Sequence, residues 1–452
     1  MSGNNNHNHN GFVWGAATAA FQIEGATTVD GRGESIWDRF AASPGRVRNG
    51  DTGDPACEHY YRWEEDLDLM RSLGLQGYRF SISWPRIQPD GRGPVNRKGI
   101  DFYRRLVEGL RERDIAPLAT LYHWDLPQAL EDEGGWASRD VVERYLEYAD
   151  IVFAELGDGV SDWLTLNEPW VVAFLGYAYG TKAPGATDWP RALRASHHLL
   201  LSHGMALRRF REAGYEGRIG VTIDLTVADP ATPSEEDAAA ARRLDGHQNR
   251  WFLDPLLRGT YPADMVELYE SQFGPFDAVR DGDLDLIAQP LDFLGVNFYR
   301  PHVVADGTGD PVLRLDYQEL DAERTAMGWP VVPTALTELL LRVRQDYGDV
   351  PLLITENGAA FDDHIDGGTV VEDDRRLAYV KGHVEALERA REAGVDVRGY
   401  YVWSLLDNFE WEHGYDKRFG IVFVDFATQR RILKRSALWY RDLIASRTST
   451  RS

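Results

Sequence analysis

The sequence predicts an α/β fold: a single (β/α)8 barrel of the TIM type with long loops after its strands. Three observations support this prediction. Eight short runs of β-branched or aromatic residues alternate with longer helical patterns. Such alternation implies parallel strands joined by right-handed crossovers. The 452 residues exceed the usual size of one domain, but barrels with insertions reach this length.

The predicted strands are spread over the whole chain. In order, they are Phe12–Ala20, Gly77–Ser83, Ala116–Tyr122, Asp162–Leu166, Arg218–Asp224, Phe293–Phe298, Leu352–Thr355 and Val397–Trp403. Between them, apolar residues of Ala137–Leu156 recur at helical spacing behind Ser138, which we expect to cap the helix. Asp373–Gly394 shows the same spacing and ends at a glycine suited to a helix stop.

Polar segments rich in Gly, Pro and Asp at Ala41–Pro55 and Val304–Trp329 predict long excursions from the barrel. No linker divides the chain, so we expect one barrel domain over residues 11–446 after a disordered tail over residues 1–10. An open doubly wound sheet is the alternative. It would lack its usual nucleotide cofactor, because no G-x-G-x-x-G follows the first strand and no Walker pattern occurs.

Charge and cysteine content limit the partners and the compartment. The net charge of −23 repels phosphate backbones and anionic lipids, which argues against nucleic acid and membranes as partners. The longest apolar run, around Trp170–Tyr179, is about half of the ~20 residues that a spanning helix needs. The single cysteine, Cys57, excludes an internal disulfide, and the tail lacks the features of a secretory signal. We therefore expect a cytoplasmic protein; the sequence leaves open whether it forms a homo-oligomer.

Two strand ends carry a Glu next to an Asn. They are Thr165-Leu-Asn-Glu-Pro169 after the fourth strand and Ile354-Thr-Glu-Asn-Gly358 after the seventh. Barrel enzymes place their chemistry at this end of the strands, and a closed barrel could bring Glu168 and Glu356 together across its opening. Two facing carboxylates are what glycoside hydrolysis requires: one protonates the leaving oxygen, and the other attacks the anomeric carbon or activates water.

The other strand ends are also polar or aromatic. In strand order they carry Gln22 and Glu24, Arg79 and Trp84, His123-Trp124-Asp125, Asn297 and Tyr299, and finally Trp403 with Glu410 and Trp411. Planar polar groups pair with vicinal hydroxyls, and aromatic faces cover the C–H surface of a sugar ring. These residues therefore predict a sugar site at the mouth of the barrel.

The motifs resemble glycoside hydrolase family 1, the retaining β-glucosidase family, from Phe12-Val-Trp-Gly-Ala-Ala-Thr-Ala-Ala-Phe-Gln22 to Asp416-Lys-Arg-Phe-Gly420. The resemblance implies that Glu168 is the acid/base and Glu356 the nucleophile, about 5–5.5 Å apart, in double-displacement hydrolysis of a β-glycoside or oligosaccharide without a metal or other cofactor. The resemblance also implies which residues surround the two glutamates. The nucleophile is supported by Arg79, Asn297 and Tyr299, and the sugar hydroxyls are contacted by Gln22, His123, Asn167, Glu410 and Trp411. The sugar ring stacks on Trp403, the aglycone side carries Trp329, and the substrate is also bound by Trp124 and Phe419.

The surroundings of the two glutamates would give their carboxyl groups different tendencies to be protonated. A cation at Arg79 and a donor at Tyr299 would favour the charged form of Glu356. We expect Glu168, with no cation identified near it, to be protonated more easily while Glu356 is charged. Once Glu356 is an ester, Glu168 loses that repulsion and can act as a base.

The resemblance also bears on the substrate. Family members that act on thioglucosides lack the acid Glu, so Glu168 favours an O-glycoside. Members specific for 6-phosphorylated sugars carry a Ser at the position of Glu410, with a Lys and a Tyr downstream, where this chain has Lys417 and Phe419. We expect Glu410 to repel a phosphate and the substrate to be unphosphorylated. Glucose, galactose and fucose differ by hydroxyl positions that the same residues could accept.

Two alternatives belong to other functional classes. One is a sugar-binding barrel without catalysis, which the intact Glu168 and Glu356 argue against. The other is a metal-dependent hydrolase, suggested by 12 histidines. His197, His198 and His203 lie in an apolar helical stretch, and no His-Glu-x-x-His occurs, so we expect packing or surface roles for them.

Overall fold

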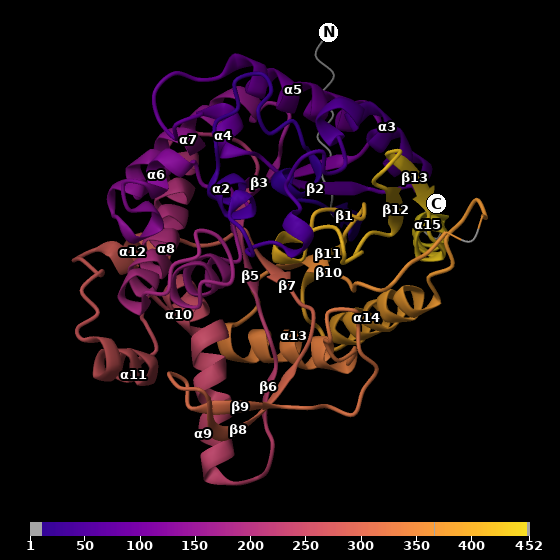
Figure 1. Ribbon diagram of the computed structural model, residues 1–452. Helices are drawn as coiled ribbons and strands as arrows, with labels where there is room; N and C mark the ends of the chain where they lie inside the picture. Colours follow the sequence, from indigo (N-terminus) through magenta and orange to yellow (C-terminus); the bar gives the residue numbers. More distant parts are fainter. Residues whose placement is uncertain (1–10, 366, 450–452) are drawn as a thin grey trace.

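The computed structural model describes residues 11–365 and 367–449, so the predicted tail over residues 1–10 lies outside the described residues. Eight parallel strands form a closed barrel (Figure 1), which confirms the predicted fold class. In their order around the barrel, the strands are β1 (Val13–Ala17), β11 (Val397–Trp403), β10 (Leu352–Asn357), β7 (Phe293–Asn297), β5 (Arg218–Asp224), β4 (Asp162–Asn167), β3 (Ala116–Tyr122) and β2 (Gly77–Ser81).

Helices surround the barrel and cover its outer face (Figure 1). The α-helices are α1 (Ala20–Ile23), α2 (Ile36–Ala42), α3 (His59–Ser72), α4 (Trp84–Ile87), α5 (Arg97–Glu112), α6 (Gln128–Glu131), α7 (Asp140–Leu156), α8 (Trp189–Glu212), α9 (Glu235–Asp245), α10 (Trp251–Arg258), α11 (Ala263–Phe273), α12 (Asp283–Ile287), α13 (Thr334–Tyr347), α14 (Asp374–Glu392) and α15 (Arg435–Ser449). The predicted domain boundary at residue 446 falls within α15. Within the described residues, no helix has both the length and the apolar character needed to cross a bilayer.

Three predicted strands have the observed bounds, and the others differ at their ends. The first is shorter than predicted: the Ser81 hydroxyl accepts a hydrogen bond from the Ala20 backbone N–H at 2.7 Å, and the chain turns into α1. The predicted cap at Ser138 is wrong. Ser138 closes the 3₁₀ turn Gly135–Ala137, with its N–H bonded to the Gly135 carbonyl at 3.0 Å, and α7 begins at Asp140 without a side-chain cap.

The excursion predicted over Val304–Trp329 contains regular structure. β8 (His302–Asp310) pairs in parallel with β6 (Ala228–Pro230) and antiparallel with β9 (Leu315–Gln318). This small sheet and α9 extend from one side of the barrel (Figure 1). The segment is polar because most of it is only partly buried, which hides the strand alternation. Ala41–Pro55 is the more irregular excursion, with the end of α2 and one 3₁₀ turn over Arg48–Gly50.

Side chains fill the interior of the barrel. Residues of six strands form one apolar cluster there: Val13, Leu118, Leu164, Phe293, Leu353 and Tyr401. Gly15 and Gly77 make room for Tyr401, since a Cβ on either would lie 2.5 or 2.8 Å from its side chain. The barrel is therefore a packed core, and a site can open only at an end.

Candidate active site

A cavity of about 730 Å³ lies at the carboxyl ends of the strands, which is the size range of small-ligand sites. The predicted site residues that line it are His123, Trp124, Glu168, Asn297, Tyr299, Trp329, Glu356, Trp403, Glu410, Trp411 and Phe419. The remaining three do not line it but bond to residues that do: Arg79 to Glu356, Asn167 to His123, and Gln22 to Glu410. The structure thus gathers all the predicted site residues in one place.

Irregular strand ends aim the two glutamates. The pairing of β4 with β5 shifts register between Leu164 and Asn167, just before Glu168. The pairing of β10 with β7 shifts between Ile354 and Glu356. Register shifts of this kind re-aim side chains next to functional sites. The backbone of Glu168 is in the left-handed region, with φ at 48°, a conformation that costs about 1–3 kcal/mol in a non-glycine residue.

Glu356 has a charged and a neutral donor. Arg79 Nη1 lies 2.6 Å from Oε1 of Glu356, and the Tyr299 hydroxyl donates to Oε2 at 2.6 Å. Arg79 and Glu356 are 1% and 3% exposed, so water screens this ion pair little. Both carboxyl oxygens are therefore held by donors that stabilise the ionised form.

Glu168 is held by a neutral amide. Asn297 Nδ2 donates to its Oε1 at 2.6 Å, and no salt bridge to Glu168 occurs among the described residues. Burial, followed by the charge of Glu356, raises the pKa of Glu168 well above its ordinary value. This agrees with the expectation that Glu168 is the more easily protonated of the two.

The expectation for Glu356 needs a correction. Burial raises the pKa of Glu356 above its ordinary value as well, although Arg79 and Tyr299 oppose the rise. Desolvation outweighs the two donors because the carboxyl lies in a closed, apolar-walled site. The two acids thus differ in how far each pKa is raised, and Glu356 is the more acidic.

Asn167 connects the groups around both acids. Its Oδ1 accepts hydrogen bonds from Arg79 Nη2 at 2.6 Å and from Asn297 Nδ2 at 3.1 Å, and its Nδ2 lies 3.1 Å from Nε2 of His123. Burial lowers the pKa of His123 well below its ordinary value, so the ring is neutral. His123 Nδ1 and Gln22 Oε1 are buried without a partner among the described residues. Buried polar atoms of this kind are suited to bind ligand hydroxyls.

Aromatic rings form the apolar walls of the cavity. Trp403 stacks on His123, with ring centroids 5.8 Å apart and planes at 17°. Trp329 packs on Tyr299 and Phe419, with ring centroids 5.4 and 6.0 Å away. These rings provide the faces that a sugar and an aromatic leaving group could pack against.

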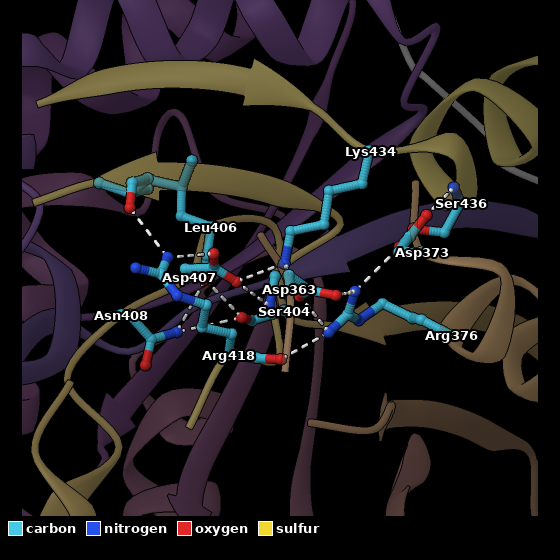
Figure 2. A network of polar contacts seen from close by, with 12 residues as sticks. Asp363, Asp373, Arg376, Ser404, Leu406, Asp407, Asn408, Arg418, Lys434 and Ser436 are labelled. Atoms are coloured by element: carbon cyan, nitrogen blue, oxygen red, sulfur yellow. Dashed lines mark hydrogen bonds and ion pairs between the residues drawn. The ribbon is translucent and has the colours of Figure 1, made fainter. Parts of the chain in front are cut away.

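A buried ionic network anchors the loop that carries Glu410, Trp411 and Phe419 (Figure 2). Lys434 Nζ lies 2.6 Å from carboxylate oxygens of both Asp363 and Asp407. Arg376 is the second cation on Asp363 and Arg418 the second cation on Asp407, each at 2.7 Å. The Asp407 carboxylate also accepts the Gly420 backbone N–H at 3.0 Å. Both ends of the loop are thereby tied to one rigid, fully paired cluster.

The loop then reaches the first strand end. Asn408 donates to the Ser404 hydroxyl at 3.0 Å (Figure 2), and its Oδ1 accepts from Gln22 Nε2 at the same distance. Gln22 Nε2 also donates to the Phe409 carbonyl at 2.9 Å. Gln22 and Glu410 are therefore positioned together.

The expected repulsion of a 6-phosphate needs a correction in one respect. Burial raises the pKa of Glu410 to about 8, so near neutral pH this carboxyl is mostly protonated and carries little of the repulsive charge assigned to it. The ammonium of Lys417 donates to the Ala326 carbonyl at 2.7 Å.

The structure adds site residues that the sequence interpretation missed. Asp224, Gln248, Arg300 and the pair Lys182 and Glu412 all line the cavity. Asp224 could have been found, because it is the polar last residue of the predicted fifth strand. Lys182 and Glu412 lie on separate loops, and no local pattern marks them.

The clustered histidines have structural partners. In α8, His197 bonds to Asp283 at 2.9 Å, His198 to the Trp136 carbonyl at 2.9 Å, and His203 to the Thr165 hydroxyl at 2.7 Å. In the described part of the chain, no three His, Cys, Asp or Glu side chains are grouped as metal ligands would be.

Comparison with known proteins agrees with this geometry. The model of Glycosyl hydrolase family 1 matches residues 5–449. A 1,4-beta-D-glucan glucohydrolase of Thermotoga neapolitana is 47% identical over 435 residues, which are 96% of this chain and 97% of that protein. A bifunctional beta-D-glucosidase/beta-D-fucosidase of Bifidobacterium breve is 45% identical over 464 residues, covering 97% and 98%. The solved beta-glucosidase from Thermotoga maritima in complex with glucoimidazole superposes with a TM-score of 0.93 at 46% identity, covering 96% and 98%. With one buried glutamate at the end of β4 and another at the end of β10 of a closed barrel, and a family match over nearly its whole length, the chain belongs to glycoside hydrolase family 1.

Proposed function

We propose that this enzyme is a retaining β-glucosidase that removes terminal non-reducing β-D-glucosyl residues from unphosphorylated O-glycosides and oligosaccharides. The observation that carries the proposal is the unequal pair of buried glutamates: Glu356 between Arg79 and Tyr299, and Glu168 bonded only to an amide. The names of the relatives support glucosides as substrates. Because one relative also acts as a fucosidase, β-fucosides are further candidate substrates, and β-galactosides are proposed with them.

In the first step, protonated Glu168 gives its proton to the glycosidic oxygen while an oxygen of Glu356 attacks the anomeric carbon. The bond to the leaving group breaks, and a glycosyl ester of Glu356 forms. The raised pKa of Glu168 keeps the proton available, and Arg79 and Tyr299 hold the attacking carboxylate ionised and oriented.

In the second step, the ester no longer carries the charge that favours protonation of Glu168. Glu168 can then take a proton from water as the water attacks the anomeric carbon and releases the Glu356 carboxylate. The Coulombic contribution of Glu356 to the pKa of Glu168 supports this change of role. Two inversions at one carbon retain its configuration.

The remaining residues are proposed to hold the sugar. Unpartnered atoms of Gln22 and His123, together with Asn167, Glu410 and Trp411, would bind its hydroxyls, and Trp403 would cover its ring. On the leaving-group side, Trp329 would pack against the aglycone. The single buried thiol, Cys57, supports action in the cytoplasm, and cell fractionation tests this.

The stereochemical outcome tests the mechanism. An NMR spectrum recorded early during hydrolysis of an aryl β-glucoside should show β-glucose as the first-formed anomer. α-Glucose as the first product would refute the retaining mechanism. No turnover at all would favour the non-catalytic sugar-binding alternative, and activity lost on exhaustive chelation and restored by a metal would favour the metal-dependent one.

A further inference from the structure

The cavity that holds the two glutamates is also lined by an arginine, Arg300. Arg300 directly follows Tyr299 after β7 and lines the cavity. Its guanidinium carbon lies 4.8 Å from the ring centroid of Trp329, which also lines the cavity. A guanidinium over an aromatic face keeps its N–H edge free for another partner.

Within the described part of the chain, the other Lys and Arg side chains of the cavity have carboxylate partners, and Arg300 has none. Arg324 pairs with Glu319, and Lys182 lies 2.5 Å from Glu412. No salt bridge to Arg300 occurs among the described residues, and burial lowers its pKa to about 10. A largely desolvated cation without a counter-ion is costly, so such a group is a candidate ligand site.

Three acids that line the cavity do not neutralise Arg300. Asp310 accepts a hydrogen bond from the Tyr179 hydroxyl at 2.7 Å, and Glu319 is paired with Arg324. Asp224 accepts from Gln248 at 3.1 Å, and burial raises the pKa of Asp224 well above its ordinary value. Burial and the charge of Arg300 lower the pKa of the neighbouring His302 to about 3, so this ring adds no charge.

We propose that Arg300 and Trp329 form a site for an aromatic aglycone that bears a carboxylate. Trp329 would cover the ring, and the free edge of the guanidinium would pair with the planar carboxylate. This inference rests on the proposed β-glucosidase function and adds a substrate class to it: β-glucosides of aromatic acids.

The test compares matched substrates in matched variants. The substrates are the 3- and 4-carboxyphenyl β-D-glucosides and the corresponding carbamoylphenyl glucosides, which have the same shape without the charge. In Arg300→Gln, kcat/KM for the better carboxylate substrate should fall about tenfold or more, as expected on losing a charge-assisted hydrogen bond. The carbamoyl substrates should lose clearly less, because their amide oxygen is a neutral acceptor and lacks the charge that strengthens the pairing. Arg324→Gln is the control, because Arg324 lines the same cavity but already has a carboxylate partner.

Different results would contradict the carboxylate site and the proposed β-glucosidase function. Equal losses on carboxylate and carbamoyl substrates, or the same selective loss in Arg324→Gln, would overturn the carboxylate site while hydrolysis itself continued. Failure of the wild type to hydrolyse any of these glucosides would instead contradict the proposed function. Inhibition of the wild type gives a measurement that needs no variant: 4-hydroxybenzoate should inhibit more strongly than 4-hydroxybenzamide, and equal or weaker inhibition would argue against the site.

Discussion

Removing one hydroxyl should shift the pH dependence of the enzyme. In Tyr299→Phe, Oε2 of Glu356 loses the donor at 2.6 Å, while Oε1 keeps Arg79. A hydrogen bond to a charged group contributes about 1.5–3 kcal/mol, and 1.36 kcal/mol corresponds to one pKa unit. The pKa of Glu356 should therefore rise by about 1–2 units. Because Glu356 must be ionised to attack, the acidic limb of kcat/KM should move to higher pH by this amount.

The assay is the pH profile of kcat/KM with an activated aryl β-glucoside, for which protonation by Glu168 matters least. Tyr379→Phe is the matched control, since Tyr379 is also buried and bonds to the Tyr299 carbonyl at 3.1 Å but not to Glu356. An acidic limb that stays in place in Tyr299→Phe, or that moves equally in the control, would refute the reasoning.

Three further predictions concern Glu168, Glu410 and Lys434. Glu168→Ala should lower kcat/KM about 10²–10⁴-fold for glucosides with poor leaving groups and far less for activated aryl glucosides, and equal losses would contradict its role as acid. Because burial raises the pKa of Glu410 to about 8, kcat/KM for a 6-phosphoglucoside relative to its unphosphorylated parent should fall as the pH rises through this value, and this fall should be absent in Glu410→Gln. Lys434→Met should cost about 3 kcal/mol of unfolding free energy in denaturant titrations, because it leaves two buried carboxylates with one cation each. Lys98 forms an exposed pair with Asp30, so Lys98→Met should cost much less, and an equal effect would show that burial is not the cause.

The sequence predicts the barrel and the neighbourhood of the site because both depend on local patterns. Strand β5, for example, is a buried β-branched run with clear ends, and Glu168 and Glu356 stand at strand ends that closure must bring together. Helix starts were less predictable. The hydroxyl of Ser138 suggested a helix cap, but Ser138 instead ends a 3₁₀ turn, and α7 begins at Asp140. Only the packed structure determines which of the two roles the residue has.

Protonation states could not be predicted from residue types. Near neutral pH, Glu410 is expected to be charged from its ordinary pKa, but burial at the cavity raises that pKa to about 8. The pairing of cations was equally hidden, since Lys417 has a backbone partner and Arg300 has no carboxylate partner among the described residues. Both properties depend on what surrounds a side chain in three dimensions, and residues far away in the sequence supply those surroundings.

The bonds of Gln22 to Asn408 and Phe409 span 386 and 387 residues, and they have a consequence for the order in which the protein folds. Contacts of such long sequence separation form late, since the entropy of closing a long loop opposes them until other structure has shortened it. On the ribosome, β1 must wait for β11 to close the barrel, and Lys434 must also emerge before it can join Asp363 and Asp407. A nascent chain that already contains both glutamates therefore still lacks a completed sugar pocket, and its first strand, which can pair with β2 on one side, still has an open edge on the side of β11 that could associate wrongly during synthesis.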